Sequence, residues 1–284
     1  MAEPSKPAPL AVIDSLPLIQ WVDRELTPLL RSLDAADWER KAVKSWRVKD
    51  VAAHLLDANL RRLSLDRDGW KPAVEDDLST WRGLVGFLDR LNAEWTLAAE
   101  RLSPRVLIDQ LETSNREVYN YFTSLDPMAV AGFPVSWAGE KESRVWMDLA
   151  RELTEKWHHQ QQIRDATERP GLQDDLVVTA VLDAFARALP RAYSETEAET
   201  GTGVLVEISD LPSCRWVLMR QSEDWGLYAG DGVTESEAQI KLPSDTAWRL
   251  FSKGLSPAAA ASVAETSGPD ALTRPFFDTL AIMG

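Results

Sequence analysis

Apolar residues recur at intervals of three and four along much of the first half of the chain, which is the period of an amphipathic helix. The pattern predicts four long helices, at about residues 11–33, 48–63, 78–102 and 143–167. The polar stretch between residues 105 and 121 is interpreted as a long loop or a weak helix. Successive long amphipathic helices indicate a four-helix bundle, in which metal and cofactor sites form between facing helices.

The period changes after the break at Arg169-Pro170-Gly171. One more amphipathic helix is predicted over about residues 175–198. Short apolar or alternating runs then predict strands at residues 204–208, 215–219, 225–228 and 238–242, with helices at about 244–253 and near the end of the chain. The sequence therefore predicts an α+β protein with a disordered tail at residues 1–9, a metal-binding helical bundle at 10–168 and a small α+β domain at 169–284.

Composition excludes several classes of function. The 284 residues, 44% of them apolar, can build two modest cores, and the net charge of −14 argues against a basic nucleic-acid or membrane surface. The beginning of the chain lacks the pattern of a signal peptide, and no apolar run reaches the ~18 residues of a membrane span. We expect a cytoplasmic monomer or homodimer without nucleic-acid or membrane partners. The single Cys214 is expected to be a buried strand residue rather than a nucleophile.

The three histidines of the chain suggest a metal site. Two of them, His158 and His159, follow Glu155 on a predicted helix, whereas His54 stands alone on another. Glu155 and His159 are four residues apart, so they project from one face about one turn from each other. His159 borders the apolar sector of its helix and His158 nearly opposes it, which favours His159 as the ligand. Together with His54 these residues predict a three-ligand site with an open position, as catalytic zinc uses.

Other residues near these histidines have less specific interpretations. Glu152 lies one turn before Glu155 and is the reserve carboxylate ligand, and Lys156 falls inside the apolar sector, where its stem is expected to carry the amine to water. Trp46, Trp137 and Trp157 are candidates for the wall of a pocket beside the metal. The competing interpretation is that the histidines are ordinary half-buried side chains satisfied by hydrogen bonds.

Two segments resemble one family. Trp46-Arg-Val48-Lys-Asp50-Val-Ala-Ala-His54-Leu-Leu is similar to the W-x-V-x-D-x-x-x-H-L segment of the DinB-like, mycothiol-dependent maleylpyruvate isomerase family, and Glu155-Lys-Trp-His-His159-Gln-Gln-Gln162 is similar to its E-x-x-x-H-x-x-D block. The resemblance runs from about Leu16 to Gly284. It implies a DinB-like bundle followed by a sterol-carrier-like domain, with His54, Glu155 and His159 as metal ligands.

The resemblance also implies a chemistry. It predicts an enzyme that uses a divalent metal, preferably Zn²⁺, to activate a low-molecular-weight thiol such as mycothiol as cosubstrate. The reaction would be isomerisation or S-transfer on a small electrophilic substrate, whose carboxylates could pair with Arg47, Arg151 or Arg164. Two alternatives stay open: a non-enzymatic metal-binding protein whose C-terminal domain binds an apolar ligand, and a metal-dependent hydrolase.

Two positions depart from the family pattern. The acidic position after the second histidine is Gln162, so we expect another group to hold the tautomer of His159. Where the family often has a catalytic Gly-Arg pair, this chain has Lys253-Gly254-Leu255. We therefore expect poor activity on maleylpyruvate and a less charged substrate.

Overall fold

The computed structural model describes residues 7–70, 72, 78 and 80–282 and divides the chain into two compact units. One unit, the helical unit, contains residues 14–132 and 152–172, and the other, the sheet unit, contains residues 133–151 and 173–282 with the start of the chain. The structure confirms the α+β class predicted from the sequence, and the expected division after residue 168 stays a prediction. Among the described residues, no helix is both long and apolar enough to cross a bilayer.

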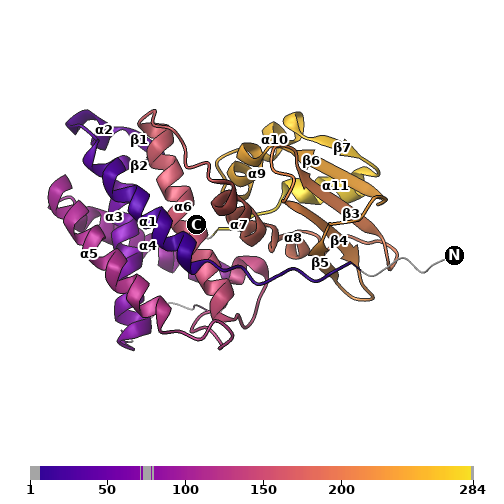
Figure 1. The fold of residues 1–284 in the computed structure, drawn as a ribbon, viewed down its shortest axis with the longest axis horizontal. Coiled ribbons are helices and arrows are strands. Elements are labelled where there is room, and N and C mark those ends of the chain that lie inside the picture. Colours follow the sequence, from indigo (N-terminus) through magenta and orange to yellow (C-terminus); the bar gives the residue numbers. More distant parts are fainter. Residues whose placement is uncertain (1–6, 71, 73–77, 79, 283–284) are drawn as a thin grey trace. The chain divides into compact units, whose positions relative to one another are not determined.

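The helical unit is built around long helices that Figure 1 shows side by side. These are α1 (Leu16–Arg31), α3 (Val48–Arg61), α5 (Pro104–Thr123) and the part of α6 (Val145–Ala166) that begins at Glu152, with α4 (Trp81–Ala99) packed on α3. Buried aliphatic residues of α1, α3 and α5 form its core. Short elements complete it: α2 (Ala35–Glu39), the β1 (Lys41–Val43) and β2 (Trp46–Arg47) ribbon, and the π-helix η1 (Arg62–Arg67) after α3.

Helix α5 corrects the interpretation of residues 105–121 as a loop or weak helix. It runs for 20 residues, begins with Ser103 as its cap and Pro104 in its first turn, and buries Leu107, Leu111 and Val118. Ser114 and Asn115 interrupt this apolar stripe but are themselves buried, and Asn59 Nδ2 donates to Ser114 Oγ at 3.0 Å and to Asn115 Oδ1 at 2.6 Å. The polar residues that weakened the pattern belong to the core.

The sheet unit contains a five-stranded sheet in the order β5-β4-β3-β6-β7. Its strands are β3 (Gly203–Ile208), β4 (Arg215–Arg220), β5 (Trp225–Ala229), β6 (Ala238–Leu242) and β7 (Glu265–Ser267), and only the β3–β6 pair is parallel. The helices are α7 (Asp175–Ala186), α8 (Leu189–Ala192), α9 (Ser244–Phe251), α10 (Pro257–Val263) and α11 (Asp270–Phe277), with the turn η2 (Ser136–Ala138). Three buried rings, Phe185, Phe251 and Phe276, join α7, α9 and α11 at centroid distances of 6.2 and 5.7 Å.

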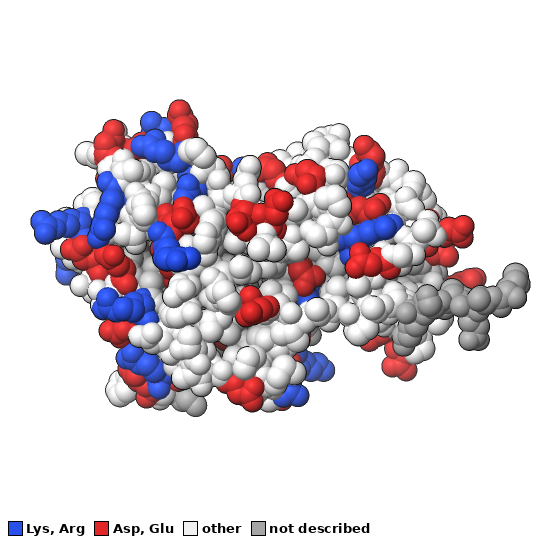
Figure 2. All heavy atoms as spheres, viewed as in Figure 1, with Lys and Arg blue, Asp and Glu red and all other residues white. Residues whose placement is uncertain are grey.

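The start of the described chain pairs with the edge of this sheet. Pro9 forms an isolated bridge with Tyr228, and Ala229 N donates to Ala8 O at 2.9 Å. This pairing corrects the expected disorder for Ala8 and Pro9, while residues 1–6 of the expected tail lie outside the described residues. On the face that Figure 2 shows, basic and acidic side chains are interspersed over the helical unit.

Candidate metal centre

Helix α3 positions His54. Its first turn is held by Asp50, whose Oδ2 accepts from Arg47 N at 2.8 Å, and the helix then buries the side chains around His54 on nearly every side. His54 is only 7% exposed. Its Nε2 lies 2.9 Å from Oε1 of Glu155 on α6, so two segments about a hundred residues apart in the sequence meet at this point.

Helix α6 supplies the other two predicted residues. Glu155 Oε1 lies 3.2 Å from His159 Nε2 one turn further along the helix, and one ligand atom from each of His54, Glu155 and His159 lies within 4.8 Å of the others. The side chain of Glu155 is 31% exposed, so the cluster can be reached from solvent. The structure thus brings together the three residues that the sequence singled out, while metal ligation by them stays a prediction.

The electrostatics of the cluster suit a cation. Burial raises the pKa of Glu155, but the adjacent imidazoles of His159 and His54 outweigh that effect, and the pKa lies well below its usual value. Burial lowers the pKa of His54. Near neutral pH the cluster therefore offers an ionised carboxylate and a neutral imidazole, the protonation states in which both can bind a metal. Two imidazole nitrogens and one carboxylate are also the ligand types of catalytic zinc.

Gln162 stands at the acidic position of the family pattern and contacts His159. Its Oε1 lies 2.8 Å from His159 Nδ1 and, as a carbonyl oxygen, can only accept. The Nδ1 of His159 therefore carries the proton, which leaves Nε2 directed at the cluster. The residue that departs from the family pattern holds the tautomer itself, with a neutral amide in place of a carboxylate.

His158 does not belong to the cluster, although it does not point away from the interior as the helical wheel suggested. It is 2% exposed, and its Nδ1 donates to Thr154 O at 2.8 Å. Burial lowers its pKa to about 3, which keeps the ring neutral. The wheel was wrong because no residue of α6 from Val145 to Arg164 is exposed, so this helix has no solvent face over most of its length.

Glu152 and Lys156 have partners of their own. Glu152 Oε1 accepts from Arg62 Nε at 3.0 Å and from Nη2 at 2.8 Å, and it lies outside the metal-ligand cluster. Lys156 does not carry its amine to water: its Nζ donates to Asp23 Oδ1 at 2.9 Å and to the amide oxygens of Asn59 and Asn115 at 3.1 and 2.9 Å. Burial raises the pKa of Asp23, although Lys156 partly counteracts this effect. Lys156 and Asp23 form a buried ion pair.

Trp46 is the aromatic neighbour of the cluster. Its ring centroid lies 5.0 Å from that of His54 and 6.3 Å from that of His159. Of the other two candidate wall residues, Trp157 is fully buried in the core at 1% exposure and Trp137 belongs to the sheet unit. Trp46 thus presents a large apolar surface beside the cluster.

The three arginines expected to bind substrate are engaged with other groups. Arg47 forms ion pairs with Asp50, Glu39 and Glu100. Arg151 pairs with Asp148 at 2.6 Å, and Arg164 donates to Pro170 O at 2.8 Å. Each of these arginines therefore has a partner in the structure, and the expectation of a less charged substrate stays a prediction.

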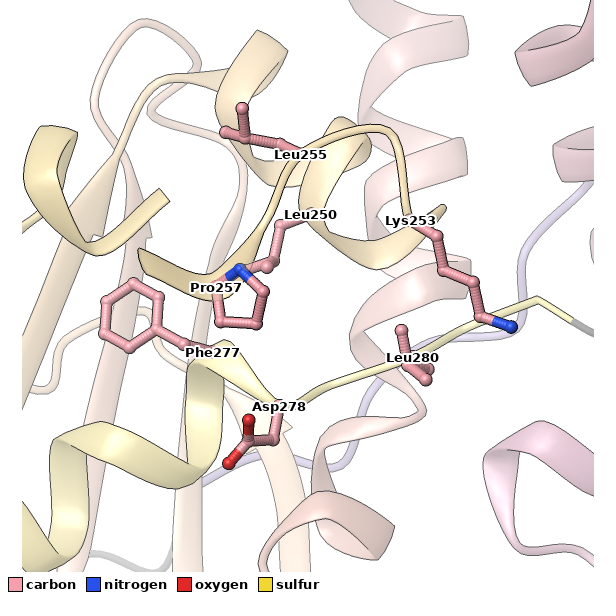
Figure 3. A pocket seen from close by; sticks show the side chains of 7 residues that line it. All are labelled: Leu250, Lys253, Leu255, Pro257, Phe277, Asp278 and Leu280. Carbon is pink, nitrogen blue, oxygen red and sulfur yellow. The ribbon is translucent and has the colours of Figure 1, made fainter. Parts of the chain in front are cut away.

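The sheet unit has a small pocket of its own, of about 200 Å³. Figure 3 shows its lining, which is mostly apolar and includes both Lys253 and Leu255 of the departing segment; the full set is Leu250, Lys253, Leu255, Pro257, Phe277, Asp278 and Leu280. Lys253 has a left-handed backbone with φ 61°. The apolar lining of this pocket favours the alternative in which the C-terminal domain binds an apolar ligand.

Comparison with known proteins supports the fold. No family model and no curated protein matches the sequence. The solved structure of the mycothiol-dependent maleylpyruvate isomerase superposes with a TM-score of 0.56 over 91% of this chain and 93% of that one, at 13% identity. The H-to-A mutant of that enzyme gives 0.55 over the same shares at 12% identity. An SCP2 ubiquinone synthesis protein, UbiJ, covers 37% of this chain and 90% of its own at 15% identity, with a TM-score of 0.25 that is too low to support an argument. The chain has the two-part fold of the isomerase, as the sequence resemblance predicted.

Proposed function

We propose that the protein is a divalent-metal enzyme that activates a low-molecular-weight thiol for isomerisation or S-transfer on a small electrophilic substrate. The convergence of two imidazoles and a carboxylate within 4.8 Å, inside the fold of an enzyme that is itself mycothiol-dependent, carries the proposal. His54, Glu155 and His159 would hold the ion, with zinc as the expected metal. A cytoplasmic location belongs to the same proposal.

Each residue around the cluster has a part in this chemistry. When bound, the cation supplies the positive charge that favours thiolate over thiol, and the thiolate is the nucleophile. Glu155 neutralises one of the two positive charges, so a net charge of +1 remains to attract the sulfur. Gln162 keeps the proton of His159 on Nδ1, and Trp46 limits the access of water. Cys214 takes no part, because burial raises its pKa to about 12.

The reaction itself needs only the thiol and an electron-poor double bond. The sulfur adds to one carbon, and the π electron pair moves onto the conjugated carbonyl group. The former double bond can then rotate, and expulsion of the thiolate restores it in the other configuration. An S-transferase differs only in that the sulfur stays attached and the electron pair takes up a proton.

The test is turnover of a cis-enoyl acid with a single carboxylate by the zinc-loaded protein with and without added thiol. Stimulation by thiol supports the proposal. Turnover that needs metal but not thiol supports the hydrolase instead, since a three-ligand site also suits a bound hydroxide. Silence in both assays together with binding of an apolar ligand supports a binding protein that uses the pocket around Leu250 and Phe277.

A further inference from the structure

Two charged residues lie on the same face of α3 as His54. Asp57 follows it by three residues and Arg61 by seven, so the three side chains form one row along the helix. Arg61 Nε lies 3.0 Å from Asp57 Oδ2, and the two side chains are only 26% and 12% exposed. The row places a half-buried ion pair directly beyond the candidate metal ligand.

Within the described part of the chain, the buried Nδ1 of His54 has no hydrogen-bond partner. Asp57 Oδ2 and Arg61 Nε are paired by charge at 3.0 Å but without the geometry of a hydrogen bond. Buried polar atoms normally find a partner, because an unpaired one costs about 1–3 kcal/mol. His54 Nδ1 is such an atom, and it lies one helical turn from the Asp57 carboxylate, which suggests a state of the site in which the two are paired.

Comparison with His159 shows that His54 lacks a hydrogen-bond acceptor at Nδ1 in the described part of the chain. His159 directs Nε2 at Glu155 and its Nδ1 donates to Gln162. His54 directs Nε2 at the same oxygen, but no described residue accepts from its Nδ1. His54 Nε2 faces the Glu155 carboxylate, which can only accept, so Nε2 carries the proton of the neutral ring and Nδ1 needs no acceptor. A metal bound at Nε2 takes the place of that proton, and the neutral ring then carries its proton on Nδ1, where an acceptor becomes necessary.

We infer that Asp57 is the positioning residue of His54, and that its Oδ2 accepts the Nδ1 proton when a divalent metal binds at Nε2. Arg61 pairs with the same carboxylate but is not needed for it to accept the proton. The exchange conserves charge on the ring, because one proton leaves Nε2 for solvent and one enters Nδ1 from solvent. The inference rests on the proposed metal centre. It adds to that centre one acceptor for each ligand histidine on the histidine's own helix, namely Gln162 for His159 and Asp57 for His54.

The test follows the tautomer of His54 by nitrogen-15 NMR of histidine-labelled protein, in which only three imidazole rings give signals. Zinc should move the wild-type proton of His54 from Nε2 to Nδ1. Asp57→Leu should weaken zinc binding in a chelator competition by about 10–100-fold, the usual effect of losing such a partner. Asp57→Asn keeps an acceptor oxygen without its charge, so its zinc affinity should lie between those of the wild type and Asp57→Leu. Arg61→Gln removes the same ion pair but keeps the acceptor, so its zinc affinity should stay near that of the wild type.

Several results would overturn the assignment. Wild-type affinity and a normal Nδ1–H signal in Asp57→Leu would do so, and so would equal losses in Asp57→Leu and Arg61→Gln, which would show that only the ion pair matters. If Asp57→Leu does not fold, Asp57→Asn replaces it, and an unchanged affinity with an unchanged Nδ1 proton shift refutes the inference. A wild-type protein that takes up no zinc refutes the metal centre itself, which is a different failure.

Discussion

Replacing Lys156 by methionine should destabilise the helical unit strongly. Its Nζ donates to Asp23, Asn59 and Asn115, and the Lys156 and Asp23 side chains are 7% and 10% exposed. Removing one partner of a buried pair typically costs about 3–5 kcal/mol because the other charge is left uncompensated. For a protein of this size that corresponds to a fall in Tm of roughly 6–20 °C.

The loss of stability in Lys156→Met should depend on pH, because it leaves the Asp23 carboxyl group without its cation. Burial raises the pKa of Asp23 in the folded protein, and the loss of Lys156 would raise it further. A carboxyl group whose pKa is raised in the folded protein binds more protons when folded than when unfolded. Its contribution to the free energy of unfolding is therefore fully present below the unfolded pKa and is lost as the pH rises through the folded pKa. The deficit of Lys156→Met should therefore be largest near neutral pH and shrink as the pH falls toward 4, the region of the unfolded carboxyl.

The assay is urea denaturation at several pH values, with the exposed Lys141→Met as control, which should stay within about 0.5 kcal/mol of the wild type. The double variant Lys156→Met with Asp23→Leu should recover most of the loss, because both charges are gone. A cost below about 1 kcal/mol for Lys156→Met, or a deficit that grows as the pH falls, would refute this account of the buried pair.

Three further predictions concern the site and the thiol. Gln162→Leu should weaken zinc binding about tenfold in a chelator competition, because His159 Nδ1 loses its acceptor; unchanged affinity would show that the contact is incidental. The protein should isomerise maleylpyruvate poorly, and Leu255→Arg should improve the rate roughly ten- to a hundredfold by adding a charge-assisted pair; efficient wild-type turnover that the substitution does not improve would contradict this. Native Cys214, whose pKa burial raises to about 12, should resist a thiol reagent at pH 8 and react fully after denaturation, whereas rapid labelling of the native protein would disprove its burial.

The sequence predicted the helices whose apolar stripes face one core. Helices α1 and α3 show the expected three- and four-residue spacing, and α3 places His54 where the motif requires it. The stretch that became α5 was misjudged because Ser114 and Asn115 look like surface residues, whereas Asn59 satisfies them inside the core. Burial of a polar side chain depends on a partner from a distant segment, which periodicity does not reveal.

Helix α6 shows the same limit at the site. Its wheel predicted one buried face, but His158, Lys156 and Gln160 are all buried, so the helix is covered over most of its length. The placement of Glu155 and His159 one turn apart on one face was nevertheless predictable, since it depends only on the helix repeat. Strand β7 was missed because all three of its residues are exposed and carry no alternating pattern.

The central claim is tested most directly by the zinc content of the purified protein and two neighbouring variants. His159→Ala removes a residue of the cluster, whereas His158→Ala removes a neighbouring buried ring that donates to Thr154 and lies outside the cluster. We predict one equivalent of zinc in the wild type and in His158→Ala, and strong depletion in His159→Ala. Zinc retained by His159→Ala but lost from His158→Ala would contradict the account.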